Sequence, residues 1–280
     1  MTVLILAPHP DDEIVACGIA ARRARAVGTP VFVLYLTTGV PQRRGYDARV
    51  WRRRQEAIAA ATLLGLEPVG FRGAPARCLR HDLDAACRDI DGALRSSGAG
   101  ELWVTAFEGG HQDHDSANAL AAAFADRLPV FEFAAYNFAG GRVRANRFAD
   151  DRGGESTIAA TPREAALKRQ ALVLYASERG NLGHVDAAHE ACRKLPAHEY
   201  GAPPHAGRLF RERFTWVPFR HPRIDWVPSA QIYRDIGAWA SAREVGRRAA
   251  LGDEPGGEPR QADREFAGAL NQTQGERGIG

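Results

Sequence analysis

Two short polar segments of this chain carry residue types that could do chemistry. The first is HPDDE at His9–Glu13, which directly follows the apolar run VLILA. The second is HQDHD at His111–Asp115, which comes shortly after the apolar run LWVT. Charge without compensation is expensive to bury at the end of a strand. Segments this dense in charge therefore indicate either a function or a cation that neutralises them.

Imidazole and carboxylate together are ligands of zinc, and catalytic zinc sites keep three protein ligands plus a water. His9 and Asp12 are three residues apart at the start of a predicted helix, so they can share a face, and His111 and His114 have the same spacing. A metal ion between the segments would neutralise the acids. The alternative is that His9 caps a strand and the acids are solvated residues favoured by the helix dipole. Either segment alone allows that alternative, but the two together favour the metal.

The elements that must position these segments alternate along the first 135 residues. Apolar runs predict strands, and amphipathic runs between them predict helices. The strands are Val3–Ala7, Val31–Leu36, Pro68–Phe71, Glu101–Thr105 and Val130–Ala134. The helices are Asp12–Val27, Arg49–Leu64, Asp82–Ser96 and His114–Arg127. This alternation predicts right-handed βαβ units and a Rossmann-like α/β fold, with a mostly parallel sheet and helices on both faces.

In such sheets, ligands bind beyond the carboxyl ends of the strands, where the strand order reverses. The common order 3-2-1-4 would place the first and fourth strands on either side of that point. The two polar segments would then flank one crevice. The first loop has no G-x-G-x-x-G to let a pyrophosphate approach the backbone, so we do not expect a dinucleotide cofactor.

The pattern weakens after Tyr136. Thr161 and Pro162 indicate a helix start, and residues 181–207, rich in His, Pro and Gly, are expected to be irregular. The run RLFRERFTWVPF allows a last strand or hairpin. We predict a main domain over residues 1–225 and an irregular C-terminal extension over 226–280, partly helical and then, from about residue 251, flexible.

Composition narrows the class of protein. The 280 residues are 45% hydrophobic and 25% charged with a net charge of +3, which is ordinary for a globular protein. No basic block with interleaved aromatics is present, so nucleic acid is not an expected partner. The four cysteines form no C-x-x-C pair. Without a signal peptide or an apolar run of about 20 residues, we expect a cytoplasmic protein with no membrane partner.

The two polar segments also carry a resemblance. PHPDDE at Pro8–Glu13 together with HQDH at His111–His114 resembles the PIG-L/LmbE-like family of zinc-dependent N-deacetylases. That family has a Rossmann-like fold and removes acetyl groups from N-acetylglucosamine-type amino sugars. RRQEAIAAATLLGL and PPHAGRLFRERF extend the resemblance over about residues 2–220. The chain departs from the family at Thr38, where an Asp is common.

The resemblance implies roles for the residues of both segments. The expected zinc ligands are His9, Asp12 and His114, and the general base is Asp11. His111, in its protonated form, is expected to hold the oxyanion, and Asp113 to orient His111.

Three further residues are predicted substrate contacts. Arg53 lies in an arginine-rich run, Tyr136 follows the fifth strand, and His205 lies in PPHAG. The expected substrate is a small molecule or conjugate that contains an N-acetyl amino sugar. The alternatives are a zinc hydrolase of a longer acyl amide or an ester, and a non-enzymatic sugar- or metal-binding module. The resemblance also allows a homo-oligomer, with residues after 136 as a source of interface.

Overall fold

The fold is built on one seven-stranded sheet. The computed structural model describes residues 1–214 and 226–251. The strands follow the order β3-β2-β1-β4-β5-β9-β8. They are β1 (Val3–Ala7), β2 (Val31–Tyr35), β3 (Glu67–Phe71), β4 (Glu101–Thr105), β5 (Val130–Phe133), β8 (Ser156–Ala159) and β9 (His189–Lys194). The first five run parallel, and β9 and β8 add antiparallel strands at one edge. The predicted α/β fold with a mostly parallel sheet is confirmed.

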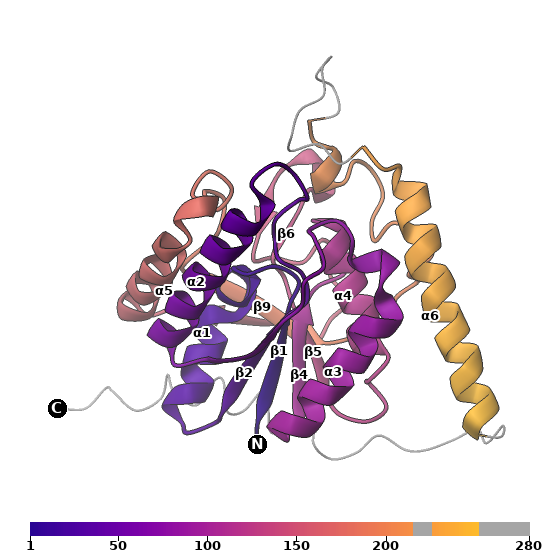
Figure 1. Cartoon of the computed structure of the whole chain (residues 1–280), viewed down its shortest axis with the longest axis horizontal. Coiled ribbons are helices and arrows are strands. Elements are labelled where there is room, and N and C mark those ends of the chain that lie inside the picture. Colours follow the sequence, from indigo (N-terminus) through magenta and orange to yellow (C-terminus); the bar gives the residue numbers. More distant parts are fainter. Residues whose placement is uncertain (215–225, 252–280) are drawn as a thin grey trace.

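Helices cover both faces of this sheet, which gives three layers (Figure 1). One face carries α1 (Asp12–Ala26), α2 (Tyr46–Leu64) and α5 (Pro162–Leu174), and the other carries α3 (Leu83–Ser97), α4 (Gln112–Ala122) and α6 (Ser229–Leu251). Alternate residues of β1 serve the two faces: Ile5 lies in the core on the α1 side, and Leu4 and Leu6 lie in the core on the α3 side. A strand that is buried on both faces is an unbroken apolar run in the sequence, so the run VLILA could be predicted to be a strand.

The antiparallel edge of the sheet was not predicted. Residues 181–207 were expected to be irregular, but they contain β9, which pairs with both β5 and β8. This strand was not predicted because it contains the charged residues Glu190 and Arg193, both of which are buried. Glu190 pairs with Lys168, and Arg193 pairs with Glu132. Buried ion pairs of this kind break the apolar pattern from which strands are predicted.

Two other predicted elements differ. α4 ends at Ala122 rather than Arg127, since the chain there turns to tighter bonds such as that from the Phe124 N–H to the Ala121 carbonyl. The run expected as a last strand or hairpin contains instead a 3-10 helix over Phe210–Glu212. The part of this run from residue 215 lies outside the described residues. The predicted flexible tail from residue 252 also lies outside them. The start of α5 agrees with prediction, because Thr161 forms a capping box with Glu164.

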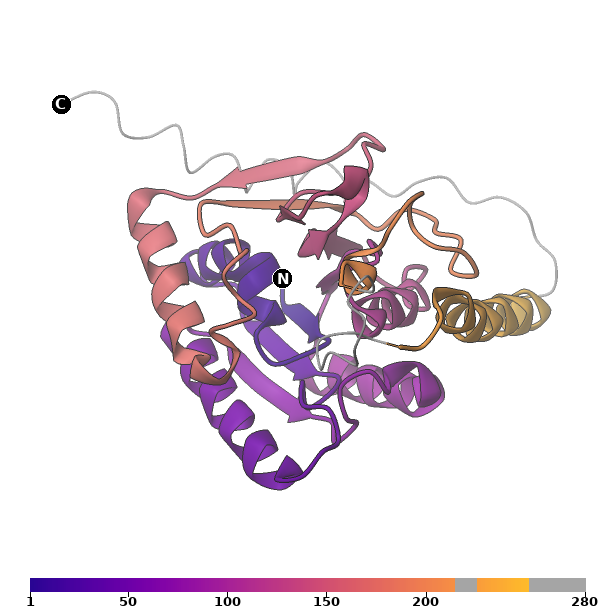
Figure 2. The same cartoon turned by 90° about the horizontal axis from the view of Figure 1, so that it is seen from above.

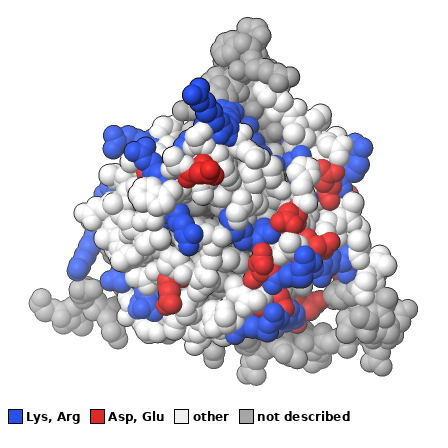
Figure 3. Space-filling model, viewed as in Figure 1, with Lys and Arg blue, Asp and Glu red and all other residues white. Residues whose placement is uncertain are grey.

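Much of the basic charge on the face that carries α3 is paired locally. Figure 3 shows acidic and basic side chains interleaved there. Arg72 contacts both Asp82 and Asp89, and Arg95 contacts Asp91.

Within the described residues, no helix is both long enough and apolar enough to cross a membrane.

A buried ion pair bridges an irregularity in α1, the helix that follows the first polar segment. Cys17 has non-helical backbone angles. The Glu190 carboxylate accepts from the backbone N–H groups of Ile19 (2.8 Å) and Ala20 (3.0 Å). The Lys168 ammonium donates to the Val15 carbonyl (3.0 Å) and to Glu190 (2.7 Å). The pair thus satisfies backbone groups on both sides of the irregular residue and fixes the path of α1.

Replacing Lys168 by Met tests this arrangement. The substitution leaves the Glu190 carboxylate buried without its cation, so we expect the free energy of unfolding to fall by about 3–5 kcal/mol. Chemical denaturation followed by circular dichroism measures the change. Arg95→Gln removes a largely exposed ion pair and serves as the control, with an expected change within about 0.5 kcal/mol. Equal effects of the two substitutions would contradict the assignment.

Candidate active site

The two polar segments meet at the carboxyl ends of neighbouring strands. β1 and β4 pair in parallel, and each runs through a short loop into the helix that follows it. The loop after β1 carries His9 and Asp11 and leads into α1 at Asp12, and the loop after β4 carries His111, which is the N-cap of α4. Figure 2 looks onto this end of the molecule. The predicted crevice between the first and fourth strands is therefore where the structure brings the charged residues together.

Three of these side chains form a compact cluster that could hold a metal ion: His9, Asp12 and His114, all buried. Asp12 Oδ2 lies 3.2 Å from His9 Nδ1 and 3.1 Å from His114 Nε2. The two ring nitrogens are 3.3 Å apart. Tetrahedral zinc with bonds of about 2.0–2.1 Å requires ligand atoms about 3.3 Å from one another. The donor set and its spacing fit zinc, and this cluster coincides with the expected ligand set.

The electrostatics of the cluster also call for a cation. Burial alone would lower the pKa of His9, but hydrogen bonds to Asp113 and Asp12 outweigh it and raise that pKa to about 10. Burial favours the neutral form of Asp12, yet His114 and His9 hold its pKa well below the usual range. The carboxylates thus demand positive charge beside them, and either a proton on His9 or a metal ion supplies it.

Asp113 lies behind His9. Its Oδ2 is 3.0 Å from His9 Nε2 and accepts from the Arg77 backbone N–H at 2.6 Å, and its Oδ1 accepts from the Leu79 N–H. The distance from Asp113 Oδ2 to His111 Nδ1 is longer, at 3.7 Å. The prediction that Asp113 orients His111 therefore missed its main partner. A carboxylate bonded to the far nitrogen of a ligand histidine fixes that ring's tautomer and orientation.

His111 has the contacts of a neutral imidazole. Its Nδ1 accepts a hydrogen bond from the Asp113 backbone N–H at 3.1 Å, so the ring hydrogen belongs on Nε2. Burial, followed by the positive charge of His9, holds the pKa of His111 well below its usual value. These contacts disagree with the predicted protonated form. They leave Nε2–H as a hydrogen-bond donor next to His9, whose ring centroid lies 4.4 Å away.

Asp11 is held in a strained backbone conformation, with φ of 129°. Such strain in a non-glycine residue is typical of functional sites. Arg53 donates to Asp11 Oδ2 at 3.0 Å and to the Pro10 carbonyl at 2.9 Å, and it also contacts Ser177 and Glu178. Arg53 thus positions Asp11, while its predicted contact with substrate stays a prediction. Burial raises the pKa of Asp11 to about 7, against the opposing charge of Arg53.

The remaining acid of the first segment is Glu13, for which no role was predicted. Its carboxylate accepts from the Asp11 backbone N–H at 3.0 Å and from the Tyr175 hydroxyl. Glu13 therefore anchors the backbone of the strained residue. The three acids have three different tasks: Asp12 belongs to the metal cluster, Asp11 pairs with Arg53, and Glu13 holds the turn.

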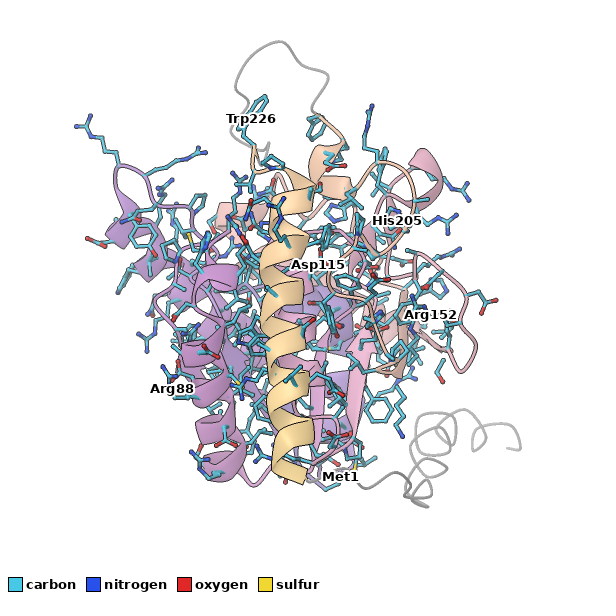
Figure 4. The ribbon with its side chains drawn as sticks, turned by 90° about the vertical axis from the view of Figure 1, so that its right-hand side faces the viewer. Met1, Arg88, Asp115, Arg152, His205 and Trp226 are labelled. Carbon is cyan, nitrogen blue, oxygen red and sulfur yellow. The ribbon has the colours of Figure 1, made fainter. Side chains whose placement is uncertain are left out.

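The loop before His111 depends on residues that sequence reasoning also missed. Asp115 accepts from the backbone N–H groups of Glu108 and Gly109 at 3.2 and 3.1 Å. Its other oxygen accepts from the Tyr233 hydroxyl of α6 at 2.9 Å, and Figure 4 shows Asp115 in the region covered by that helix. A side chain at Gly110 would lie 2.4 Å from the Tyr136 carbonyl. In the sequence, the two glycines directly before His111 were the available indication that this loop is closely packed.

Of the other predicted substrate contacts, Tyr136 lies beside the cluster, whereas His205 makes a local contact. Thr38, where the chain departs from the family, also bonds locally. The Tyr136 hydroxyl lies 3.5 Å from His114 Nε2, so this residue borders the cluster. His205 is labelled in Figure 4, and its Nδ1 is 2.9 Å from the Ala206 carbonyl. The histidine of this region that contacts Tyr136 is His184, with ring centroids 5.0 Å apart. Thr38 bonds locally to the Val40 carbonyl and the Tyr46 hydroxyl.

The fold and the site define an α/β protein with a candidate metal centre at the carboxyl edge of its sheet. Comparison with known families agrees with that class: residues 4–125 match the family model PIG-L, described as GlcNAc-PI de-N-acetylase. The resemblance to the PIG-L/LmbE-like family predicted from PHPDDE and HQDH is thereby confirmed. The matched residues include both segments and all three members of the cluster.

Similar proteins extend this finding. The chain is 33% identical over 135 residues to 2'-N-acetylparomamine deacetylase of Streptomyces fradiae, an alignment that covers 40% of this chain and 47% of that protein. The chain thus spans about half of the length of this curated relative. Among solved structures, a deacetylase of teicoplanin biosynthesis matches with a TM-score of 0.57 and 19% identity, covering 69% of this chain and 97% of the other. The A40926 pseudoaglycone deacetylase matches with a TM-score of 0.55 and 20% identity, covering 70% and 98%. These two likenesses establish the fold.

Asp113→Asn tests the role of the carboxylate behind His9. The amide cannot accept as strongly from the His9 ring, so we expect the affinity for zinc to fall about 10- to 100-fold while the fold is retained. Competition with a chromophoric chelator measures the affinity. Asp89→Asn, which alters a surface pair with Arg72, is the matched control and should bind zinc like the parent. Unchanged affinity in Asp113→Asn would remove this role.

Proposed function

We propose that the protein is a zinc-dependent hydrolase that removes the N-acetyl group from an amino sugar in a small molecule or conjugate. The observation that carries the proposal is the His9, Asp12 and His114 cluster at tetrahedral spacing, with a further carboxylate, Asp11, held beside it by Arg53. A site that only binds a metal or a sugar has no need of this additional strained acid.

The substrate class rests on the comparisons. The matched family model is named for a de-N-acetylase of an N-acetylglucosamine lipid, and the relative from Streptomyces fradiae is named for deacetylation of 2'-N-acetylparomamine. Both names describe removal of an acetyl group from an amino sugar nitrogen. We infer the same reaction class for this chain, with a small-molecule glycoside of antibiotic type as substrate.

Zinc bound by His9 Nδ1, Asp12 Oδ2 and His114 Nε2 would supply a Lewis acid that polarises the acetamide carbonyl and acidifies a water. Asp11 acts as the general base and takes a proton from the attacking water. The water oxygen bonds to the carbonyl carbon, and His111 donates from Nε2–H to the carbonyl oxygen as negative charge develops there. The carbon–nitrogen bond then breaks, and Asp11 returns its proton to the leaving amine. The products are acetate and the free amino sugar.

Asp11→Asn is the direct test of this scheme. The amide keeps the size of the side chain but cannot take a proton, so we expect the rate of acetate release to fall at least about 100-fold. Zinc content and the melting temperature should stay close to those of the parent, because Asp11 is not a member of the cluster. Acetate release is measured against a panel of N-acetylglucosamine glycosides. Full activity in Asp11→Asn would refute the assigned base.

The pH profile gives a second test. Asp11 must be ionised to accept a proton, and burial raises its pKa to about 7. Activity should therefore rise as the pH is increased through this acidic limb and then level off. Zinc nearby favours the ionised carboxylate, so the midpoint with metal bound should lie at or below about 7. A profile that falls as pH rises from 5 to 7 would be incompatible with Asp11 as the base.

A further inference from the structure

The turn that binds the carboxylate behind His9 contains a residue in an unfavourable backbone conformation. Asp113 accepts from the Arg77 N–H at 2.6 Å and from the Leu79 N–H at 3.1 Å. The chain between β3 and α3 supplies both donors, and it passes through Arg77 with a φ of 73°. A residue other than glycine seldom adopts this left-handed conformation, and it persists only where the surrounding structure holds it. Contacts from outside the turn must therefore fix it.

The guanidinium of Arg80 makes such contacts. Arg80 lies in a 3-10 helix over Leu79–His81, and its Nη1 donates at 3.0 Å to the carbonyl of Arg77, the strained residue itself. Nη1 also donates to the side chain of Gln112, the residue of α4 that directly precedes Asp113. Arg80 thus contacts both the turn that donates to Asp113 and the start of the helix that carries Asp113.

Helix α6 fixes the other side of this guanidinium. Arg80 Nε donates to Asp235 Oδ2 at 3.1 Å, and the Gln231 side chain donates to the second oxygen of Asp235 at 2.6 Å. The Arg80 side chain is only 7% exposed. A guanidinium carries its donors in one rigid plane, so it can hold several acceptors in a fixed arrangement. Arg80 therefore connects three segments of the chain: the turn, the start of α4 and α6.

We propose that Arg80 is a positioning residue for the metal centre. Its guanidinium holds the turn at Arg77 against the start of α4, so that the N–H groups of the turn keep the Asp113 carboxylate on His9 Nε2. The His9 ring is thereby oriented with Nδ1 toward the metal cluster. The inference rests on the zinc site of the proposed function. It adds a residue that acts through Asp113 rather than on the metal or the substrate.

The alternative is that Arg80 only stabilises the fold through its ion pair with Asp235, and Arg72 offers a matched comparison. The Arg72 side chain is 9% exposed and contacts two acids, Asp82 and Asp89. Asp89 lies within α3, and Asp82 is the N-cap of that helix. Arg72→Met therefore removes a similarly buried guanidinium with its ion pairs, and it leaves the turn that binds Asp113 untouched.

Competition with a chromophoric chelator measures the zinc affinity of the full chain and its variants. We expect Arg80→Met to lower that affinity about three- to tenfold, which is less than the loss expected for Asp113→Asn, because Arg80 acts through Asp113. Arg72→Met should bind zinc like the parent, and chemical denaturation shows that each variant is folded. Parent-like affinity in Arg80→Met, or equal losses in the two variants, would overturn the proposal.

Arg80→Lys keeps the proposal testable if Arg80→Met does not fold. The lysine keeps a cation beside Asp235 but lacks the planar set of donors. It should therefore retain most of the stability and still bind zinc about two- to fivefold more weakly than the parent. Full zinc affinity in a folded Arg80→Lys would show that charge alone is needed and would refute positioning by the guanidinium.

A double-mutant cycle tests whether Arg80 acts through Asp113. If it does, adding Arg80→Met to Asp113→Asn should lower the zinc affinity further by less than about twofold, because the carboxylate on which Arg80 acts is already gone. The full loss of Arg80→Met, repeated in the Asp113→Asn background, would contradict this path.

Amide hydrogen exchange in the zinc-free protein gives a readout that does not need the metal. The amides of Arg77 and Leu79 donate to Asp113, so they should exchange at least about tenfold faster in Arg80→Met than in Arg72→Met. Equal exchange of these two amides in both variants would mean that Arg80 does not hold the turn, and would reject the proposal.

Failure of this proposal and failure of the proposed function give different results. Parent protein that binds zinc tightly, with no loss of affinity in Arg80→Met, would reject the positioning role alone. The expected loss in Arg80→Met, without acetate release from any glycoside by the zinc-loaded parent, would reject the deacetylase and keep the positioning role. A parent that binds no zinc would reject both.

Discussion

The structure depends on how buried negative charge is balanced at the carboxyl edge of the sheet. Asp11, Asp12, Glu13 and Asp113 are all buried in one small region, and uncompensated burial of even one carboxylate would be costly. Each is balanced differently: by a guanidinium, by imidazoles, or by backbone N–H and hydroxyl donors. The balance around Asp12 and Asp113 still requires a positive charge, which either protonated His9 or a metal ion would supply. The buried carboxylates of this region therefore need positive partners, and a metal ion held by His9, Asp12 and His114 would be one such partner.

The fold supplies what this balance needs. Parallel pairing of β1 with β4 brings two loops from distant parts of the chain to one edge, and the helices that follow start there, with their N-termini beside the acids. The partners come from further away still: Arg53 from α2, Tyr175 from the end of α5, and Tyr233 from α6. The site is thus assembled from both helical layers, and its geometry is as rigid as the packing of those layers on the sheet.

The sequence predicted the parts whose information is local. Strands β1 and β4 could be predicted from their apolar residues, and the topology of a parallel sheet predicted that the two polar segments meet at one edge. The resemblance to the PIG-L/LmbE-like family then implied His9, Asp12 and His114 as the ligand set. Partnerships across the chain could not be predicted in the same way. Nothing near Asp113 shows that its carboxylate faces His9, and nothing near His184 shows that its ring meets Tyr136. The strand β9 was hidden because Glu190 and Arg193 pair with residues that lie elsewhere in the sequence.

The hydrogen bond between Tyr233 and Asp115 has a consequence for how the molecule opens. Asp115 directly follows His114 and holds the loop of Glu108 and Gly109 in place. Detachment of α6 would remove one partner of this carboxylate and loosen the turn on which His111 and His114 stand. We therefore expect α6 and the metal cluster to belong to one cooperative unit of the native state. Amide hydrogens of that loop and of the first turns of α6 should exchange together rather than as separate regions.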